Sequence, residues 1–258
     1  MSLRGKTAVV TGGAGYLGTA ISETLAELGA NLVIASRDQA KCVKKCQEIV
    51  QLYGAAIQAV PLQLDLLEKD SATKFFSQVH EHFPAIDILV NNAWSGNKNS
   101  WESITDKDWE YDVNMSLNSV FRMTKAAFPD LKSTRGVVLN IGSLYSHLAP
   151  DYRMYDGKEF ANPPSYGAAK AGVIQFTKYL SSFLSPYGIR VNALSPGAFP
   201  HPPTQKHKEF MERLSAKNPL NRIGYPDDLK GAVALLCSDA GRYITGQDLH
   251  VDGGWGVW

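Results

Sequence analysis

Short apolar runs alternate with longer segments of helical periodicity along this chain of 258 residues, and this alternation constrains its fold most strongly. Most of the runs are continuously apolar rather than alternately apolar and polar, as expected of strands buried on both faces. Strands of that kind form parallel sheets with helices on both sides. The runs predict strands at residues 7–11, 31–35, 57–64, 86–90, 136–141, 189–194 and 247–251.

The helical segments complete a regular strand–helix alternation, without an internal repeat or a linker. A chain of this length suits one large domain with a sizeable core. We therefore predict a single Rossmann-type domain over residues 1–258, an α/β doubly wound sheet of about seven parallel strands with helices on both faces. The predicted helices cover residues 17–28, 39–52, 69–82, 106–131, 165–185 and 226–238.

Three irregular segments follow predicted strands, at residues 94–105, 145–164 and 196–219. They should gather at the carboxyl ends of the strands, where open α/β sheets bind ligands. We expect substrate contacts mainly from these segments, with 145–164 and 196–219 as the substrate-site loops.

The first predicted strand runs directly into the sequence GAGYLG at residues 13–18, and a helical pattern follows it. This is a G-x-G-x-x-G pattern in the strand, turn and helix context of a dinucleotide-binding site. The glycines allow a sharp turn close to a pyrophosphate, and free N–H groups at the helix start stabilise its charge. The turn therefore predicts a nucleotide site rather than a chance glycine-rich loop.

Charge and composition exclude several classes of protein. The formal net charge is +1, so we predict neither a nucleic-acid partner nor a polybasic membrane surface. No apolar run approaches the ~18 residues of a membrane span, and the first residues show no signal-peptide core, so we expect a cytoplasmic protein. The three cysteines, Cys42, Cys46 and Cys237, form no disulfide framework. No spacing predicts a metal site, and His147, His201 and His207 stand in loops without partner spacing for a metal.

Tyr166 and Lys170 lie one helical turn apart, and Ser143 precedes them. Side chains at i and i+4 share a helix face, so the ammonium can favour the phenolate and lower the pKa of Tyr166 below its usual value of about 10. That would make Tyr166 a general acid/base near neutral pH. The spacing alone is also typical of an ordinary half-buried tyrosine beside a solvated lysine, so its weight depends on the rest of the chain.

Eight motifs in the same order make the chain resemble the classical short-chain dehydrogenase/reductase family over essentially its whole length. The resemblance implies an oxidoreductase that uses a nicotinamide nucleotide. The motifs are TGGAGYLG at 11–18, LDL around Asp65, NNA at 91–93, VNMSL containing Asn114, IGS ending at Ser143, YGAAK at 166–170, RVNALSPG at 190–197 and VDGG at 251–254.

The resemblance implies catalytic roles for four residues. Ser143 would hydrogen-bond the substrate oxygen, and Tyr166 would exchange a proton with it. Lys170 would lower the pKa of Tyr166, helped by the cationic oxidised nicotinamide, and would hold the nicotinamide ribose. Asn114 would hold a water that relays protons from Lys170 to solvent, or it would satisfy backbone groups at a helix irregularity.

The resemblance also implies a set of nucleotide contacts. Asp65 would meet the adenine amino group, Asn91 with Ala93 would brace the strand end beside the adenosine ribose, and the backbone of Pro196 and Gly197 would face the carboxamide. The implied cofactor-binding residues are Gly12, Gly13, Gly15, Tyr16, Leu17, Gly18, Ser36, Arg37, Asp65, Leu66, Asn92, Ala93, Tyr166, Lys170, Pro196 and Gly197.

Ser36, Arg37 and Asp38 bear on the choice of nucleotide. An NAD site usually has an acidic residue at the end of the second strand for the ribose 2′-hydroxyl, whereas an arginine nearby accommodates a 2′-phosphate. Here Ser36 takes the acidic position, Arg37 follows it, and Asp38 is placed to cap the next helix. We therefore predict NADP(H) in preference to NAD(H), with Asp38 on the ribose as the alternative.

Three positions depart from the family pattern. Gly15 comes one residue earlier than the usual middle glycine, as in an extended, sugar-nucleotide branch of the family. Trp94 stands where a glycine usually follows NNA, and His201 where a threonine that touches the carboxamide is common. Two alternatives stay open: a sugar-nucleotide epimerase or dehydratase with retained NAD(P), and a non-enzymatic nucleotide-sensing protein. The short chain argues against the first, and the catalytic residues argue against the second.

Ser143 and Tyr166 are 23 residues apart, a longer gap than is usual in the family. The added segment contains Tyr152, Tyr155 and Phe160 among charged residues. Aromatic faces with charged neighbours suit a polyhydroxylated substrate, but an insertion that caps the rim or meets a neighbouring subunit would look the same. We predict an NADP(H)-dependent oxidoreductase acting on a small polar ketone or secondary alcohol, with sugar derivatives as one candidate class.

The predicted helix at 165–185 is apolar over much of its circumference, so it needs burial on more than one side. The resemblance to the family implies that such a helix pairs with its copy in a neighbouring subunit. We predict a homotetramer or dimer, with a small-molecule substrate as the other partner.

Overall fold

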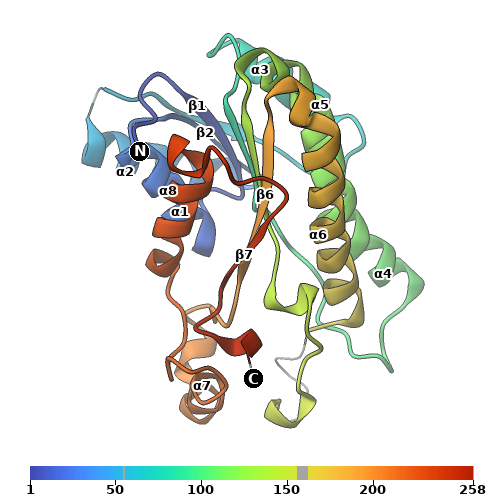
Figure 1. The fold of residues 1–258 in the computed structure, drawn as a ribbon. Coiled ribbons are helices and arrows are strands. Elements are labelled where there is room, and N and C mark those ends of the chain that lie inside the picture. Colours follow the sequence, from blue (N-terminus) through green and yellow to red (C-terminus); the bar gives the residue numbers. More distant parts are fainter. Residues whose placement is uncertain (55, 156–161, 258) are drawn as a thin grey trace.

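Seven parallel strands form one sheet, in the order β3-β2-β1-β4-β5-β6-β7, in the computed structural model, which describes residues 1–54, 56–155 and 162–257 (Figure 1). The strand order reverses between β1 and β4, so the loops that leave these two strands diverge and open a crevice. The predicted fold class is confirmed. The strands are β1 (Thr7–Thr11), β2 (Asn31–Ser36), β3 (Ala59–Gln63), β4 (Ile88–Asn91), β5 (Val137–Ile141), β6 (Arg190–Pro196) and β7 (Asp248–Val251).

Helices cover both faces of the sheet because successive residues of each strand point to opposite sides. Val10 of β1 packs in one apolar cluster with α1, α2 and α8, whereas its neighbour Val9 packs in another with α3, α5 and α6. Figure 1 shows α1 and α8 on one side of the sheet and α5 and α6 on the other. The helices are α1 (Tyr16–Glu27), α2 (Gln39–Tyr53), α3 (Ser71–His80), α4 (Asp106–Val113), α5 (Ser119–Thr134), α6 (Pro164–Leu184), α7 (Lys208–Ser215) and α8 (Lys230–Cys237).

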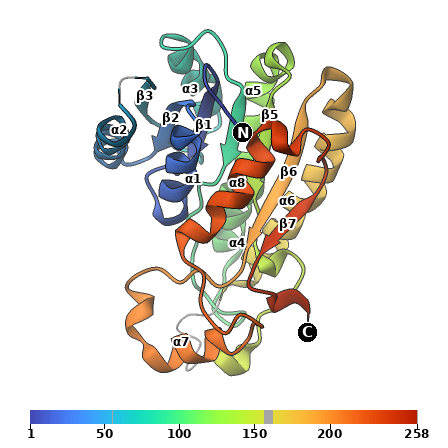
Figure 2. The same ribbon diagram turned by 60° about the vertical axis from the view of Figure 1, so that its left-hand side comes forward.

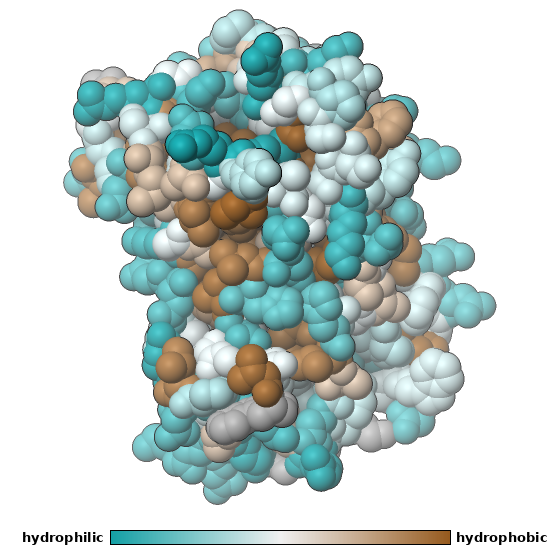
Figure 3. All heavy atoms as spheres, in the orientation of Figure 1, coloured by the Kyte–Doolittle hydropathy of each residue, from teal (hydrophilic) through white to brown (hydrophobic). Residues whose placement is uncertain are grey.

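β7 forms one edge of the sheet, and α7 lies beyond the carboxyl ends of the strands (Figure 2). On the face drawn in Figure 3, hydrophobic residues gather over α8 and β7, and hydrophilic residues border them. Ala232, Ile244 and Leu249 are half-buried there and pack on the core cluster. Among the described helices, none combines the length and apolar character that crossing a membrane requires.

Two predicted segments differ from the structure. The helix expected at 106–131 is broken into α4, a π-helical turn (Asn114–Asn118) and α5, and the Ser119 hydroxyl donates a hydrogen bond to the Met115 carbonyl at 2.5 Å within that turn. The segment 196–219, expected to be irregular, contains α7, which forms because Phe210 and Leu214 lie one turn apart and are both buried. All seven predicted strands are present, and no end is shifted by more than two residues.

Candidate functional site

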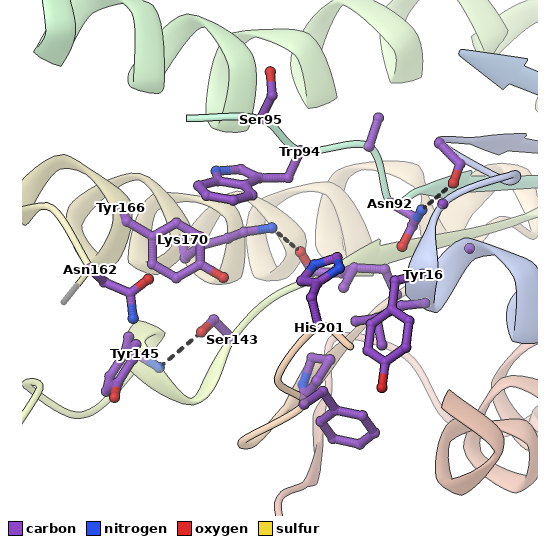
Figure 4. Close-up of a pocket in the computed structure, with 18 of the residues that line it drawn as sticks. Tyr16, Asn92, Trp94, Ser95, Ser143, Tyr145, Asn162, Tyr166, Lys170 and His201 are labelled. Atoms are coloured by element: carbon purple, nitrogen blue, oxygen red, sulfur yellow. Dashed lines mark hydrogen bonds between the residues drawn. The ribbon is translucent and has the colours of Figure 1, made fainter. Parts of the chain in front are cut away.

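A cavity of about 500 Å³ opens at the carboxyl ends of the strands, beside β1 and β4. The turn between β1 and α1 lines one end, and α6 with the segment after β5 lines the other, while His201 from the segment after β6 lies beside Tyr16 (Figure 4). Among the described residues that line it, Arg37, Lys98 and Lys170 are cationic and none is an aspartate or glutamate. A cavity with this balance of charge favours an anionic ligand, such as a nucleotide.

Glycines shape the turn between β1 and α1 because a side chain would not fit there. Gly12 has a φ of 65°, and a Cβ at this position would lie 2.9 Å from the Cα of Ala93. A Cβ on Gly18 would overlap the Gly12 carbonyl oxygen. Helix α1 begins at Tyr16 without a side-chain cap, so its first N–H groups remain free for phosphate oxygens. The predicted residues that line the cavity here are Gly12, Gly15, Tyr16, Leu17 and Gly18.

The end of β2 places Ser36 and Arg37 in the cavity lining, as predicted. The neighbouring Asp38 caps α2 instead, since its carboxylate accepts a hydrogen bond from the Lys41 backbone N–H at 3.1 Å. That hydrogen bond holds the pKa of Asp38 below its usual value. The carboxylate that could otherwise meet a ribose 2′-hydroxyl is therefore engaged with a helix.

The end of β4 braces the glycine turn from the side. The Asn92 amide donates to the Thr11 carbonyl at 2.9 Å, and the Ala93 N–H donates to the Thr11 hydroxyl at 3.1 Å. Asn91 is buried, and its amide donates to the Asn140 side chain of β5 at 2.8 Å, which ties the two strand ends together. The lining at this end includes Leu66, Asn92 and Ala93.

Three predicted site residues, Gly13, Asp65 and Asn114, lie outside the described lining of the cavity. The Asp65 carboxylate accepts a hydrogen bond from the backbone N–H two residues on, at 3.0 Å. The Asn114 side-chain oxygen accepts from Asn118 at 2.7 Å and from Arg122 at 3.2 Å. Asn114 therefore pairs with two side chains at the helix irregularity, rather than with the backbone groups expected there.

Ser143, Tyr166 and Lys170 meet at the opposite end of the cavity (Figure 4). Ser143 follows β5, whereas Tyr166 and Lys170 stand in the first turns of α6, which begins at Pro164. The Ser143 side chain lies close enough to Tyr166 to lower the pKa of its phenol. The Lys170 ammonium donates to the Ile141 carbonyl at 2.6 Å and lies 6.0 Å from the centre of the Tyr166 ring. The structure thus brings the predicted proton donor, cation and hydroxyl together.

Burial controls the ionisation of both groups on α6. It raises the pKa of Tyr166 above its usual value, and the nearby Ser143 side chain offsets only part of this effect. Burial also lowers the pKa of Lys170 to about 8. The expected lowering of the Tyr166 pKa is therefore wrong for the protein alone, because desolvation of the phenolate outweighs the nearby ammonium. The phenol is consequently a neutral proton donor in the protein itself.

Aromatic side chains surround the remaining space near Ser143. The hydroxyls of Tyr145 and Tyr155 are 2.6 Å apart, and the Tyr155 and Phe210 rings have centroids 5.6 Å apart. Trp255 belongs to the same apolar cluster and lines the cavity. The predicted residues Pro196 and Gly197 also line the cavity.

Trp94 and His201, two of the three positions that depart from the family pattern, both line the cavity. The Trp94 ring meets the Tyr166 ring edge-on, with centroids 5.1 Å apart. The His201 ring lies 4.8 Å from that of Tyr16, whose hydroxyl accepts a hydrogen bond from Gln205 at 3.0 Å. The segment after β6 therefore covers the first turn of α1.

The long segment between Ser143 and Tyr166 contributes directly to the cavity. Tyr155 is buried and lines it, as does Asn162, whereas Tyr152 is 51% exposed and stands outside it. Phe160 and the charged stretch at 156–161 lie outside the described residues.

Several lining residues, among them Lys98, Tyr145 and Phe210, were not predicted individually, although each lies in a segment that was expected to provide substrate contacts. Phe210 could have been found from its spacing with Leu214, which is that of one helix face. Lys98 and Tyr145 carry no such local signal, because their positions depend on where their loops fold.

Comparison with protein families and curated proteins groups the chain with reductases over nearly its full length. Residues 13–256 match the family described as Enoyl-(Acyl carrier protein) reductase. The 3-oxoacyl-[acyl-carrier-protein] reductase FabG of Aquifex aeolicus is 31% identical over 256 residues, covering 98% of each chain. The FabG of Escherichia coli is 33% identical with the same coverage.

Solved structures extend the similarity to the whole fold. Pseudomonas aeruginosa RhlG, in a complex with NADP, has a TM-score of 0.88 at 30% identity, covering 98% of this chain and 97% of that one. A short chain dehydrogenase from Leptospira borgpetersenii with bound NAD+ has a TM-score of 0.84 at 31% identity, covering 98% and 94%.

Proposed function

The chain belongs to the short-chain dehydrogenase/reductase family and is an oxidoreductase acting on a CH–OH group, and we propose that it transfers hydride between NADP(H) and a small polar ketone or secondary alcohol. One observation carries this proposal: Ser143, Tyr166 and Lys170 meet in a cavity whose far end is a close-fitting glycine turn. The turn fits a nicotinamide nucleotide because Gly12 and Gly18 let the chain fold tightly where a Cβ would meet protein atoms, and the first N–H groups of α1 are left for the pyrophosphate. When bound, the nicotinamide supplies or accepts the hydride.

The side chains around Tyr166 exchange the proton. In the reducing direction the neutral phenol donates its proton to the substrate oxygen, which also accepts a hydrogen bond from Ser143. Lys170 has a pKa of about 8, so it is mostly protonated at neutral pH and stabilises the phenolate that forms. The Ile141 carbonyl holds the ammonium in place. A relay role for Asn114 stays a prediction.

NADP(H) is supported by the residues at the end of β2. Ser36 and Arg37 face the cavity, and Arg37 can pair with a 2′-phosphate. The Asp38 carboxylate accepts a hydrogen bond as the cap of α2, so it is a weaker acceptor for a ribose 2′-hydroxyl. Initial rates at matched concentrations of NADPH and NADH test this preference, and we expect the higher kcat/KM with NADPH.

Sugar derivatives are the substrate class that we favour. Tyrosine hydroxyls and the Asn162 amide stand among aromatic faces in the substrate end, and this combination suits a polyhydroxylated molecule. A second candidate, a 3-oxoacyl thioester, is supported by the names of the FabG relatives and by the apolar side chains of Leu144, Phe210 and Leu214 in the same lining.

A substrate panel separates these candidates. Purified protein would be assayed by nicotinamide absorbance with NADPH against keto sugars, keto sugar acids and 3-oxoacyl thioesters. Turnover of the first two groups with a kcat/KM at least tenfold above that of the thioesters is the expected result. Product formation without a net change in nicotinamide absorbance would instead support an epimerase or dehydratase with retained nucleotide.

The outer face of α5 and α6 supports the proposed homotetramer or dimer. Phe121, Tyr179 and Phe183 are each at least half exposed there, and the rings of Phe176, Tyr179 and Phe183 stack along α6. Exposed aromatic surface of this kind is typical of interfaces. We propose that two copies pair through this face and that the protein works in the cytoplasm. Light scattering after size exclusion would show a mass above that of one chain.

A further inference from the structure

Outside the cavity, a compact group of potential metal ligands joins two segments that are about one hundred residues apart in the chain. His147 follows the 3-10 turn Leu144–Ser146, and Asp248 and His250 belong to the edge strand β7. One imidazole nitrogen of each histidine and one carboxylate oxygen lie within 4.8 Å of one another. None of the three is among the described residues that line the cavity. The prediction of no metal site considered only spacing along the chain, so it could not detect ligands that come together from distant segments.

The two strand residues face the same way. Asp248 and His250 are two positions apart in β7, so their side chains leave the same face of the strand. His147 Nε2 lies 2.6 Å from Asp248 Oδ2, and His250 Nε2 lies 3.3 Å from the same oxygen. The two imidazole rings have centroids 4.7 Å apart. Both Nε2 atoms therefore converge on one carboxylate oxygen.

The surroundings of Asp248 leave one of its oxygens unsatisfied. Its side chain is 8% exposed, and the Ser195 hydroxyl donates to Oδ2 at 2.9 Å. Oδ1 is buried and has no hydrogen-bond partner in the part of the chain that the structure describes. No lysine or arginine of the described residues forms an ion pair with this carboxylate, and a buried carboxylate is costly without a cation or a full set of donors. A metal ion would supply that missing charge.

We propose that His147, Asp248 and His250 form a binding site for a divalent transition metal ion, with Zn²⁺ as the ion that fits best. Two imidazole nitrogens and one carboxylate oxygen are a set that Zn²⁺ takes, and ligands bonded at about 2.0–2.2 Å in a tetrahedron stand roughly 3.3 Å apart. The His250–Asp248 separation of 3.3 Å already matches, while His147 has to withdraw by less than 1 Å. The histidine side chains are 35% and 42% exposed, so water can take the fourth position.

Ser195 would orient the carboxylate by its hydrogen bond to Oδ2, as hydrogen-bonded partners of metal ligands commonly do. The ion would also tie the segment after Ser143 to the edge of the sheet. Ser143 is hydrogen-bonded to Ser146 within this segment, because the Ser143 N–H donates to the Ser146 hydroxyl at 3.2 Å. The His147 N–H donates to the Leu144 carbonyl, also at 3.2 Å. Metal loading should therefore stiffen the backbone that carries Ser143.

The test is a calorimetric titration of the full chain with ZnCl₂ near pH 7.5, after treatment with a chelator. We expect saturable binding close to one ion per chain, and an affinity lower by at least tenfold in His147→Gln and in His250→Gln. His82→Gln is the matched control, since His82 is an exposed histidine in the loop after α3. Nucleotide binding by each variant verifies that it is folded.

Two further readouts identify the site. Co²⁺ should give the visible absorption of a low-symmetry site in the parent protein and in His82→Gln, and should lose it in the other two variants. Binding should also weaken in acid, because protons compete with the metal ion for its ligands. The proposal is overturned if Zn²⁺ does not saturate a site below about 100 μM, or if His147→Gln and His250→Gln bind it as tightly as His82→Gln.

Discussion

The two ends of the cavity are built in different ways. The nucleotide end depends on backbone: Gly12 and Gly18 are positions where no side chain fits, and the neighbouring strand end holds the turn by hydrogen bonds to Thr11. The substrate end depends on side chains from distant segments, such as Tyr145 and Phe210. The difference implies that the nucleotide end tolerates little change, while the substrate end can be altered without disturbing the nucleotide.

The largest effect should follow from Gly18→Ala. The added Cβ overlaps the Gly12 carbonyl, so the turn has to move, and we expect a loss of more than about 4 kcal/mol in the free energy of unfolding together with the loss of nucleotide binding. Gly231→Ala is the control, because its Cβ meets nothing within 4 Å and helix α8 should gain about 0.5–1 kcal/mol. Urea unfolding measures both. Equal stability of the two variants would contradict the close fit of the turn.

Phe210→Ala should damage only the substrate end. Phe210 is 6% exposed and its ring packs against that of Tyr155. Truncation to alanine should therefore lower the free energy of unfolding by about 3 kcal/mol. We expect the substrate KM to rise at least tenfold while the Kd for NADPH changes less than twofold. Leu220→Ala, at a side chain that is 62% exposed, should change neither. An equal loss of nucleotide affinity in Phe210→Ala would show that the two ends are not separable.

The burial of Lys170 should appear as a pH dependence of stability. Its pKa is about 8 in the folded protein and near 10.5 when exposed. Below pH 8 the Lys170 side chain is protonated in both the folded and the unfolded protein. Between pH 8 and 10 the unfolded chain keeps a proton that the folded protein loses, so the free energy of unfolding should rise with pH. The gain is on the order of 2 kcal/mol. Because the cysteines of the unfolded chain titrate in the same range, the readout is the slope of stability against pH for the parent protein minus that for Lys170→Met. Equal slopes would contradict a buried, desolvated ammonium.

The smallest predicted effect concerns the choice of nucleotide. Arg37→Ala should raise the KM for NADPH about tenfold, or about 1.4 kcal/mol, because a charge that pairs with the 2′-phosphate is lost. The KM for NADH should change less than twofold. Lys44→Ala, which removes an exposed cation from α2 outside the cavity lining, is the control. An equal rise in KM for both nucleotides would show that Arg37 does not pair with the 2′-phosphate.

The sequence could predict what local patterns determine. Apolar runs located the seven strands, the glycine spacing located the nucleotide turn, and the i, i+4 spacing placed Tyr166 and Lys170 on one helix face. Asp38 was correctly predicted as a helix cap. These features depend on residues that are neighbours along the chain or one helical turn apart.

Long-range contacts could not be predicted in the same way. The Tyr145–Tyr155 hydroxyl contact and the convergence of His147 on Asp248 need the folded loops. The sign of the Tyr166 pKa shift also depends on folding, since burial rather than the lysine dominates it. α7 was missed because its apolar residues are few and its neighbours along the chain look irregular.

Replacement of Tyr166 by Phe is the most direct test of the account. The variant keeps the ring that packs edge-on against Trp94 and loses only the hydroxyl that exchanges the proton. We predict that kcat falls by about 10²–10⁴-fold while the Kd for NADPH, measured by nicotinamide fluorescence, stays within twofold of the parent value. A variant that retains kcat within twofold of the parent would contradict the assignment of Tyr166 as the general acid/base.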